Sequence, residues 1–221
     1  MSTKPVIETD QIRTWTGTFG REYTDRNQYK PAQLDLFYEA MYGVTRTELN
    51  TRFLQDVPRD ARILEVGCNI GNQLLLLHQM GFANLHAIEI QDYALAHARQ
   101  RVPSATLSQG SALAIPYNDG EFDLVFTSGV LIHIAPNDLR LALAEIHRCA
   151  KTWIWGLEYF APTMTEVNYR GHDNLLWKTD YARAYLQQFS DLELTREERL
   201  RYLENENVDT MFLLRRKPGV S

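Results

Sequence analysis

The chain has 221 residues, of which 44% are hydrophobic and 23% charged, and its formal net charge is −5. This composition is that of a globular domain with a full core, and its acidic balance disfavours a long nucleic acid as the main partner, since such a protein carries a basic face. Cys68 and Cys149 match no metal or redox spacing. No apolar run reaches membrane-spanning length, and the first ten residues hold no apolar signal core. We therefore expect a cytoplasmic protein with free thiols, no metal and no membrane partner.

Predicted strands and helices alternate along the chain. Short apolar runs bounded by turn residues predict strands at residues 61–66, 85–90, 105–107, 122–126, 152–160, 192–200 and 208–216. Apolar residues at helical spacing predict helices at residues 72–80, 92–101 and 138–150. This alternation predicts an α/β fold with a parallel sheet covered on both faces. Such sheets bind ligands at the carboxyl ends of their strands.

A loop with two glycines follows the first predicted strand and reads Glu65-x-Gly67-x-Asn69-x-Gly71. The glycines let the backbone turn sharply and approach a ligand. The dinucleotide fingerprint G-x-G-x-x-G is absent, and a carboxylate at the strand end repels a pyrophosphate. S-adenosylmethionine (SAM) carries an ammonium, a sulfonium and no phosphate. The loop therefore favours SAM over NAD.

The same stretch resembles motif I of the class I SAM-dependent methyltransferases, E/D-x-G-x-G-x-G. Asn69 stands at the middle glycine, and Asn tolerates left-handed backbone angles. Glu89 ends the second predicted strand, where an acid accepts bonds from both ribose hydroxyls. Residues 110–126 resemble the family's segment from the adenine-binding turn to the fourth strand, with Ser111 in place of Asp. The resemblance, over about residues 61–160, implies a Rossmann-like, seven-stranded, mostly parallel sheet.

On this basis we expect a single methyltransferase domain over residues 1–221. Its four parts are a helical lid segment, a SAM-binding core, an acceptor-binding insertion and a C-terminal strand pair, at residues 1–50, 51–160, 161–185 and 186–221. The residues expected to bind SAM lie in the loops after the strands: Glu65, Gly67, Cys68, Asn69, Gly71, Glu89, Ile90, Gly110, Ser111, Ala112, Ser128, Gly129 and Val130.

Two segments outside the core pattern combine aromatic and charged side chains. Residues 13–27 predict either a lid that closes over SAM or a helix packed on the sheet edge. Residues 158–183 follow the fifth strand, and a loop of this length is functional or pinned by its own rings. Expected acceptor contacts come from both segments and from the loop after strand four: Tyr23, Arg26, Asn27, His133, Glu158, Tyr169, Arg170 and His172.

Methyl transfer from a sulfonium needs in-line geometry and, for a hydroxyl or ammonium acceptor, a base, but no metal. His133 follows the fourth strand and His172 lies in the insertion. Either histidine is a candidate catalytic base. For His133, orienting the acceptor or bonding to backbone beneath the pocket are alternatives.

The patterns F-G-x-x-Y-x-x-R-N, E-V-G-C-N-x-G and Y-R-G-H-D-x-x-L-W-K occur in this order. Together they resemble the methylases associated with pseudaminic acid biosynthesis. The resemblance implies a bacterial enzyme, monomeric or homodimeric, that methylates N or O of a small polar acceptor such as an amino sugar or sugar nucleotide. An amino acid, peptide or nucleobase acceptor, and a SAM-binding partner subunit without catalysis, are the alternatives.

Overall fold

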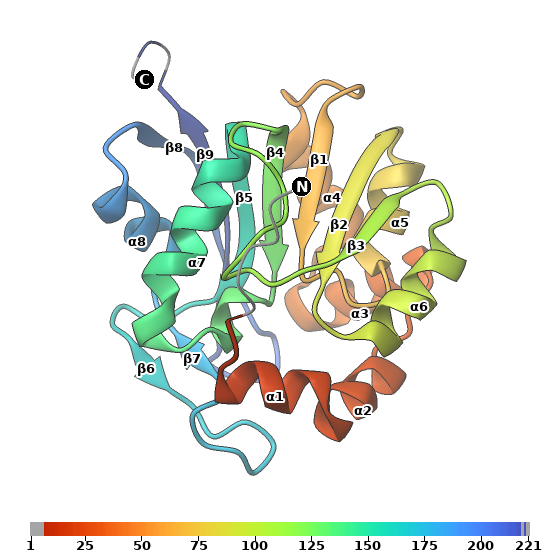
Figure 1. Cartoon of the computed structure of the whole chain (residues 1–221), viewed down its shortest axis with the longest axis vertical. Coiled ribbons are helices and arrows are strands. Elements are labelled where there is room, and N and C mark those ends of the chain that lie inside the picture. The colour runs from red at the N-terminus through yellow and green to blue at the C-terminus, as the bar shows by residue number, and fades with distance from the viewer. Residues whose placement is uncertain (1–6, 218, 220–221) are drawn as a thin grey trace.

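The computed structural model describes residues 7–217 and 219 of the chain. Residues 1–6 of the expected lid segment, and 218 and 220–221 of the expected C-terminal segment, lie outside this description. The main sheet has seven strands in the order β3-β2-β1-β4-β5-β9-β8 (Figure 1). The strands are β1 (Arg62–Val66), β2 (Asn84–Glu89), β3 (Thr106–Gln109), β4 (Phe122–Ser128), β5 (Ala150–Tyr159), β8 (Leu192–Arg201) and β9 (Val208–Arg216).

The sheet confirms the α/β fold class expected from the sequence. Strands β3, β2, β1, β4 and β5 pair in parallel, and β9 runs antiparallel between β5 and β8. Each predicted strand and helix is present, with small shifts at its ends. Because β9 is antiparallel, its first residues lie beside the carboxyl end of β5, where Tyr159 pairs with Asp209.

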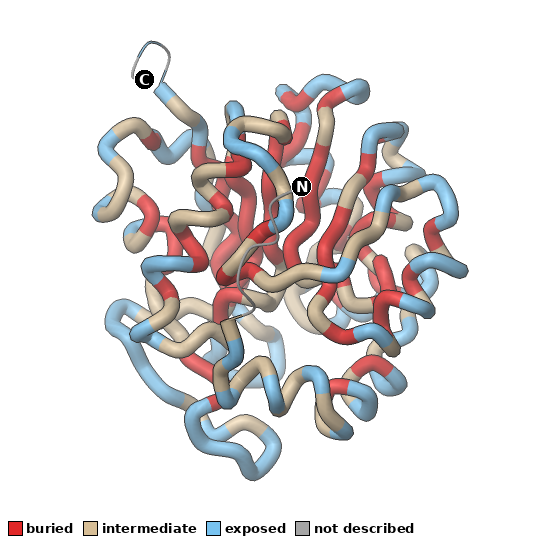
Figure 2. Tube along the Cα trace, viewed as in Figure 1, coloured by how far each residue is buried: buried red, intermediate tan, exposed pale blue. Residues whose placement is uncertain are grey.

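Side chains alternate along the strands into two cores, one on each face of the sheet. Ile63 of β1 belongs to one core and Leu64 to the other, as the two-residue period of a strand requires. Helices α3 (Pro31–Tyr42), α4 (Arg46–Leu54) and α5 (Asn72–Gln79) pack on the first face, together with part of α6 (Asp92–Arg101). Helices α7 (Pro136–Cys149) and α8 (Tyr181–Gln188) pack on the second. Figure 2 shows the buried residues concentrated along the strands.

The N-terminal segment divides into two parts with different positions. Helices α1 (Asp10–Thr16) and α2 (Thr18–Arg26) lie beyond the carboxyl ends of the parallel strands (Figure 1), and we call them the lid helices. Helices α3 and α4 instead bury Leu34, Leu49 and Phe53 against the sheet. Only the first part has the position expected of a lid.

The segment after β5 contains more regular structure than its sequence indicated. Strands β6 (Thr165–Glu166) and β7 (Trp177–Lys178) pair antiparallel, and α8 follows them. The turn between these strands is exposed and includes Arg170 in a left-handed conformation. Leu175 and Leu176 return the chain to the core. Among the described residues no helix is both long and apolar enough to cross a membrane.

Candidate active site

The loop between β1 and α5 is held in a left-handed course at three positions. The φ angles of Gly67, Asn69 and Gly71 are 75°, 47° and 78°. A Cβ on Gly67 would lie 2.7 Å from Cγ2 of Val130, so glycine is required there for space as well as for conformation. Asn69 adopts the left-handed angle that we expected it to tolerate, and its Oδ1 accepts a 2.8 Å bond from the Ile70 amide.

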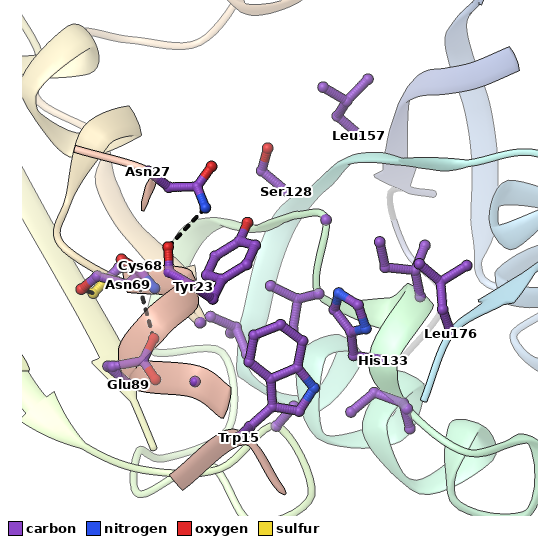
Figure 3. Close-up of a pocket in the computed structure, with 18 of the residues that line it drawn as sticks. Trp15, Tyr23, Asn27, Cys68, Asn69, Glu89, Ser128, His133, Leu157 and Leu176 are labelled. Atoms are coloured by element: carbon purple, nitrogen blue, oxygen red, sulfur yellow. Dashed lines mark hydrogen bonds between the residues drawn. The ribbon is translucent and has the colours of Figure 1, made fainter. Parts of the chain in front are cut away.

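Two buried carboxylates stand at the carboxyl ends of β1 and β2. The Glu89 carboxylate accepts bonds from the backbone amides of Asn69, at 2.7 Å, and Gln91, at 3.0 Å (Figure 3). Glu65 is 3% exposed, and its Oε2 has no hydrogen-bond partner. Burial raises the pKa of both carboxyl groups. A site lined by two buried carboxyl groups disfavours phosphate and favours ligands that offer hydroxyl or cationic groups.

These carboxylates border a cavity of about 430 Å³, the size of a cofactor pocket. Twelve of the thirteen residues expected to bind SAM line it, all except Gly71. Of the eight expected acceptor residues, five line it: Tyr23, Asn27, His133, Tyr169 and Arg170. The strands, the lid helices and the insertion therefore meet around one space, as Figure 3 shows for Glu89, Trp15 and Leu176.

Gly71 and Glu158 lie outside the cavity lining, and their expected ligand contacts stay predictions. Gly71 precedes α5, where a Cβ would lie 2.8 Å from Cγ2 of Val102, so this glycine permits helix packing. Glu158 is buried outside the cavity lining, and its carboxylate accepts bonds from the amides of Val130 and Ile132. Burial raises the pKa of Glu158 to about 7. Glu158 thus holds the turn after β4 from beneath.

Arg26 and His172 also lie outside the cavity lining. Arg26 is on the outer side of α2, 3.8 Å from the Glu22 carboxylate. His172 is exposed in the turn between β6 and β7, with its ring edge-on to Phe19 at 4.9 Å. A sequence pattern does not reveal which side of a helix or turn faces a cavity. His172 therefore lies outside the cavity lining, and its role as a catalytic base stays a prediction.

His133 lines the cavity at the end of the short helix η1 (Leu131–His133). Its Nδ1 lies 2.8 Å from the Leu175 carbonyl oxygen. A carbonyl only accepts, so Nδ1 carries the proton and Nε2 has a free lone pair. Burial lowers the pKa of His133 to about 4, which keeps the ring neutral at pH 7. The Trp15 ring packs over it at 4.4 Å, so the backbone bond orients a neutral proton acceptor.

The lid helices are attached to the glycine loop by a chain of side-chain hydrogen bonds. The Asn69 amide donates to Thr24 Oγ1, and Thr24 donates to Gln91 Oε1, each at 3.1 Å. The Gln91 amide donates to the Trp15 carbonyl at 2.6 Å. Thr24 and Gln91 are buried. The side chain that replaces the middle glycine of motif I therefore connects this loop to the lid.

Sequence reasoning missed the far wall of the cavity. Asp209 lines it at the start of β9, surrounded by tyrosines from α3, β5 and the β8–β9 turn: Tyr38, Tyr42, Tyr159 and Tyr202. If the antiparallel pairing of β9 with β5 had been known, it would have indicated this position for Asp209. The pattern of apolar residues predicts a strand but does not give its pairing direction. Among residues 7–217 and 219, no group of His, Cys, Asp or Glu side chains is arranged to hold a metal ion.

Comparison with known proteins supports the class of domain. Residues 64–152 match the family model of a methyltransferase domain. Over 90 residues the chain is 36% identical to an uncharacterised methyltransferase of Synechocystis sp., a match that covers 41% of this chain and 42% of that protein. Over 161 residues it is 26% identical to 24-methylenesterol C-methyltransferase 2 of Arabidopsis thaliana, covering 67% of this chain and 44% of that one. These matches span less than half the length of the curated relatives.

Solved structures share the fold at low sequence identity. The 1,6-didemethyltoxoflavin-N1-methyltransferase of Burkholderia thailandensis, crystallised with its substrate and S-adenosylhomocysteine, superposes with a TM-score of 0.71 at 12% identity, over 98% of this chain and 93% of that one. Magnesium protoporphyrin IX methyltransferase of Synechocystis gives a TM-score of 0.69 at 14% identity, over 93% and 98%. Residues 64–152 are thus similar to a methyltransferase domain, and the chain has the Rossmann-like fold that these methyltransferase structures share.

Proposed function

We propose that this chain is a SAM-dependent methyltransferase that methylates N or O of a small polar acceptor. The observation that carries the proposal is the pair of buried carboxylates, Glu65 and Glu89, at the ends of adjacent strands around a left-handed loop. A phosphate-free nucleoside cation suits these carboxylates, whereas the pyrophosphate of NAD does not. The methyltransferase-domain match over residues 64–152 supports the same ligand.

The residues present fit SAM at each end of the molecule. Each carboxylate oxygen has two acceptor sites, so Glu89 keeps one free site per oxygen for the ribose hydroxyls. The unpaired Oε2 of Glu65 supplies an acceptor for the methionine ammonium, near Ser128–Val130. Gly110–Ala112 would border the adenine, although the Ser111 hydroxyl already accepts a 3.1 Å bond from the Leu113 amide.

His133 is the proposed proton acceptor for the reaction. SAM, when bound, supplies a methyl group on a sulfonium. A lone pair on the acceptor N or O forms the new bond to the methyl carbon as the carbon–sulfur bond breaks, and Nε2 of His133 takes the acceptor's proton. Trp15 and Tyr169 cover the ring at 4.4 and 5.4 Å, so these side chains shield that proton transfer from water.

For the acceptor, we propose an amino sugar or a related polar molecule of a bacterial glycan or natural-product pathway in the cytoplasm. The resemblance to the pseudaminic acid-associated methylases and the polar, aromatic cavity support this class. The tetrapeptide N-P-P-Y of amino-group DNA methylation is absent at the end of β4, where residues 127–130 read TSGV, which disfavours a nucleobase. An amino acid or peptide acceptor remains the second candidate, because it too is small and polar.

Calorimetric titration of the purified chain with SAM, S-adenosylhomocysteine (SAH) and NADH tests the cofactor assignment. We expect micromolar binding of SAM and SAH and no heat with NADH; the opposite preference would contradict the proposal. Tritiated-methyl SAM added with a bacterial extract then tests catalysis. Label in a small-molecule fraction is expected, whereas tight SAM binding without any transferred label would identify a non-catalytic partner subunit.

A further inference from the structure

One end of the cavity is lined by tyrosines around a single buried acid. Tyr42 of α3 and Tyr202 of the β8–β9 turn donate hydrogen bonds to Oδ2 of Asp209, at 2.5 and 3.3 Å. Their rings meet edge-to-face at 5.1 Å, and Tyr38 and Tyr159 extend the same wall. We call these four tyrosines and Asp209 the tyrosine box. It contains none of the residues that we assign to SAM.

The acid at the centre of the tyrosine box is incompletely paired. Asp209 is 4% exposed and lines the cavity, yet its Oδ1 has no hydrogen-bond partner. A buried carboxylate oxygen without a partner costs free energy in the empty protein. A bound group that donates a hydrogen bond to Oδ1 would remove that cost, and a cationic donor would also match the charge.

The charges around the box favour a cation over an anion. Of the ionisable side chains in the described part of the chain that line the cavity, four are carboxylic acids, Glu65, Glu89, Asp138 and Asp209, and Arg170 is the only arginine or lysine.

Two further cations lie near Asp209, but both have other partners. Arg46 is fully buried and outside the cavity lining, and it donates to Asn50 and Tyr38. Lys178 donates to Asn207 at 2.7 Å and lies 5.3 Å from the centre of the Tyr159 ring. Neither makes a hydrogen bond to Oδ1 of Asp209.

We propose that the tyrosine box binds the ammonium group of the methyl acceptor, with Oδ1 of Asp209 as its hydrogen-bond acceptor and the rings of Tyr42 and Tyr202 as its cation–π partners. The other two rings already contact cations, Tyr38 with Arg46 at 5.2 Å and Tyr159 with Lys178 at 5.3 Å. This inference rests on the proposed methyltransferase function and narrows the acceptor to an amine-bearing molecule. An ammonium has no lone pair, so the anchored nitrogen is not the nucleophile. The methyl group goes to a second N or O of the same molecule, and a nucleotide-linked sugar without an amine is disfavoured.

Binding of matched fragments to the SAH-saturated chain tests this assignment. The probes are three cations, methylammonium, trimethylammonium and glucosamine, and three counterparts, acetate, phosphate and N-acetylglucosamine, each followed by ligand-observed NMR. We expect the cations to bind and the counterparts not to bind. Asp209→Asn keeps a hydrogen-bond acceptor for Tyr42 and Tyr202 and removes the negative charge. This variant should lower the affinity for each cation at least tenfold.

Asp138→Asn is the matched control, because Asp138 also lines the cavity but belongs to the first turn of α7 and not to the tyrosine box. We expect the affinity of this variant for each cation to change less than threefold. SAH affinity and melting temperature, measured on every variant, separate loss of the fold or of the cofactor site from loss of the box. Cations that bind no better than their counterparts, or that bind Asp209→Asn as tightly as wild type, would overturn the inference. Absence of SAH binding to the wild-type chain would instead contradict the proposed function.

Discussion

The two ends of the cavity are built from different kinds of chain segment. The end formed by β1, β2 and their loops uses residues that are close together in sequence, from Glu65 to Ala112. The tyrosine box joins α3, the end of β5 and the start of β9, so its members lie up to 171 positions apart, from Tyr38 to Asp209. A local motif therefore identifies the first end, whereas only the folded sheet identifies the second.

His133, the proposed proton acceptor, lines the same cavity and should affect turnover most. His133→Asn keeps a donor for the Leu175 carbonyl and removes Nε2. We expect transfer of tritiated methyl to the extract fraction that wild type labels to fall about 100-fold or more, the range of general-base catalysis, with SAH affinity unchanged. The wild-type rate should rise with pH through about 4, the pKa that burial gives His133, and the variant should lack that rise. Retained turnover would make His133 an orienting residue.

Gly67 tests the cofactor end alone. Gly67→Ala imposes a left-handed angle on alanine and a 2.7 Å contact with Val130, which together cost about 2 kcal/mol of SAH binding, or roughly 30-fold in affinity. Gly81→Ala is the control, because Gly81 has a φ of 91° with nothing within 4 Å of the added Cβ. Calorimetry should show the affinity loss only for Gly67→Ala. Equal losses would assign the effect to general strain.

The contrast between the two ends also explains what the sequence predicted. The order of strands and helices, the sheet and the twelve cavity-lining residues that we expected to bind SAM follow from local apolar spacing and from the resemblance of residues 61–160 to the methyltransferase motifs. The positions of Asp209 and Tyr202 at the cavity did not follow from the sequence, because β9 reaches the cavity only through antiparallel pairing with β5. Arg26 and His172 were assigned to the acceptor from their residue type and their segments, and neither residue is part of the cavity lining.

The hydrogen bond between Asn69 and Thr24 joins the lid helices to the cofactor end. Asn69→Gly keeps the left-handed angle and removes the donor; Thr24→Val removes its acceptor and keeps the shape. Each variant should lower the affinity for SAH about fivefold, which corresponds to about 1 kcal/mol of binding free energy. Each should also speed proteolysis of the lid helices. The double variant should lose less than the sum, because either single change already removes the shared Asn69–Thr24 bond. Each change also removes one bond of its own, from Thr24 to Gln91 or from the Ile70 amide to Asn69. Fully additive losses would show that the two side chains act independently.

Arg26→Ala and His172→Ala should have the smallest effects. Arg26 contacts Glu22 at the surface and His172 packs edge-on to Phe19, and we place neither in the cofactor or acceptor site. SAH affinity and methyl transfer should each remain within about twofold of wild type, in line with the small value of surface contacts. A tenfold loss of transfer by His172→Ala would restore this residue as a catalytic candidate.

Glu89 is the residue on which the account depends most directly, since its carboxylate both holds the Asn69 amide and is assigned to the ribose. The decisive measurement is a calorimetric SAH titration of Glu89→Ala beside Asp138→Asn, with melting temperatures to confirm that both variants fold. The account predicts at least a 30-fold loss of affinity for Glu89→Ala and less than a threefold change for Asp138→Asn. Unchanged SAH affinity in a folded Glu89→Ala protein would contradict it.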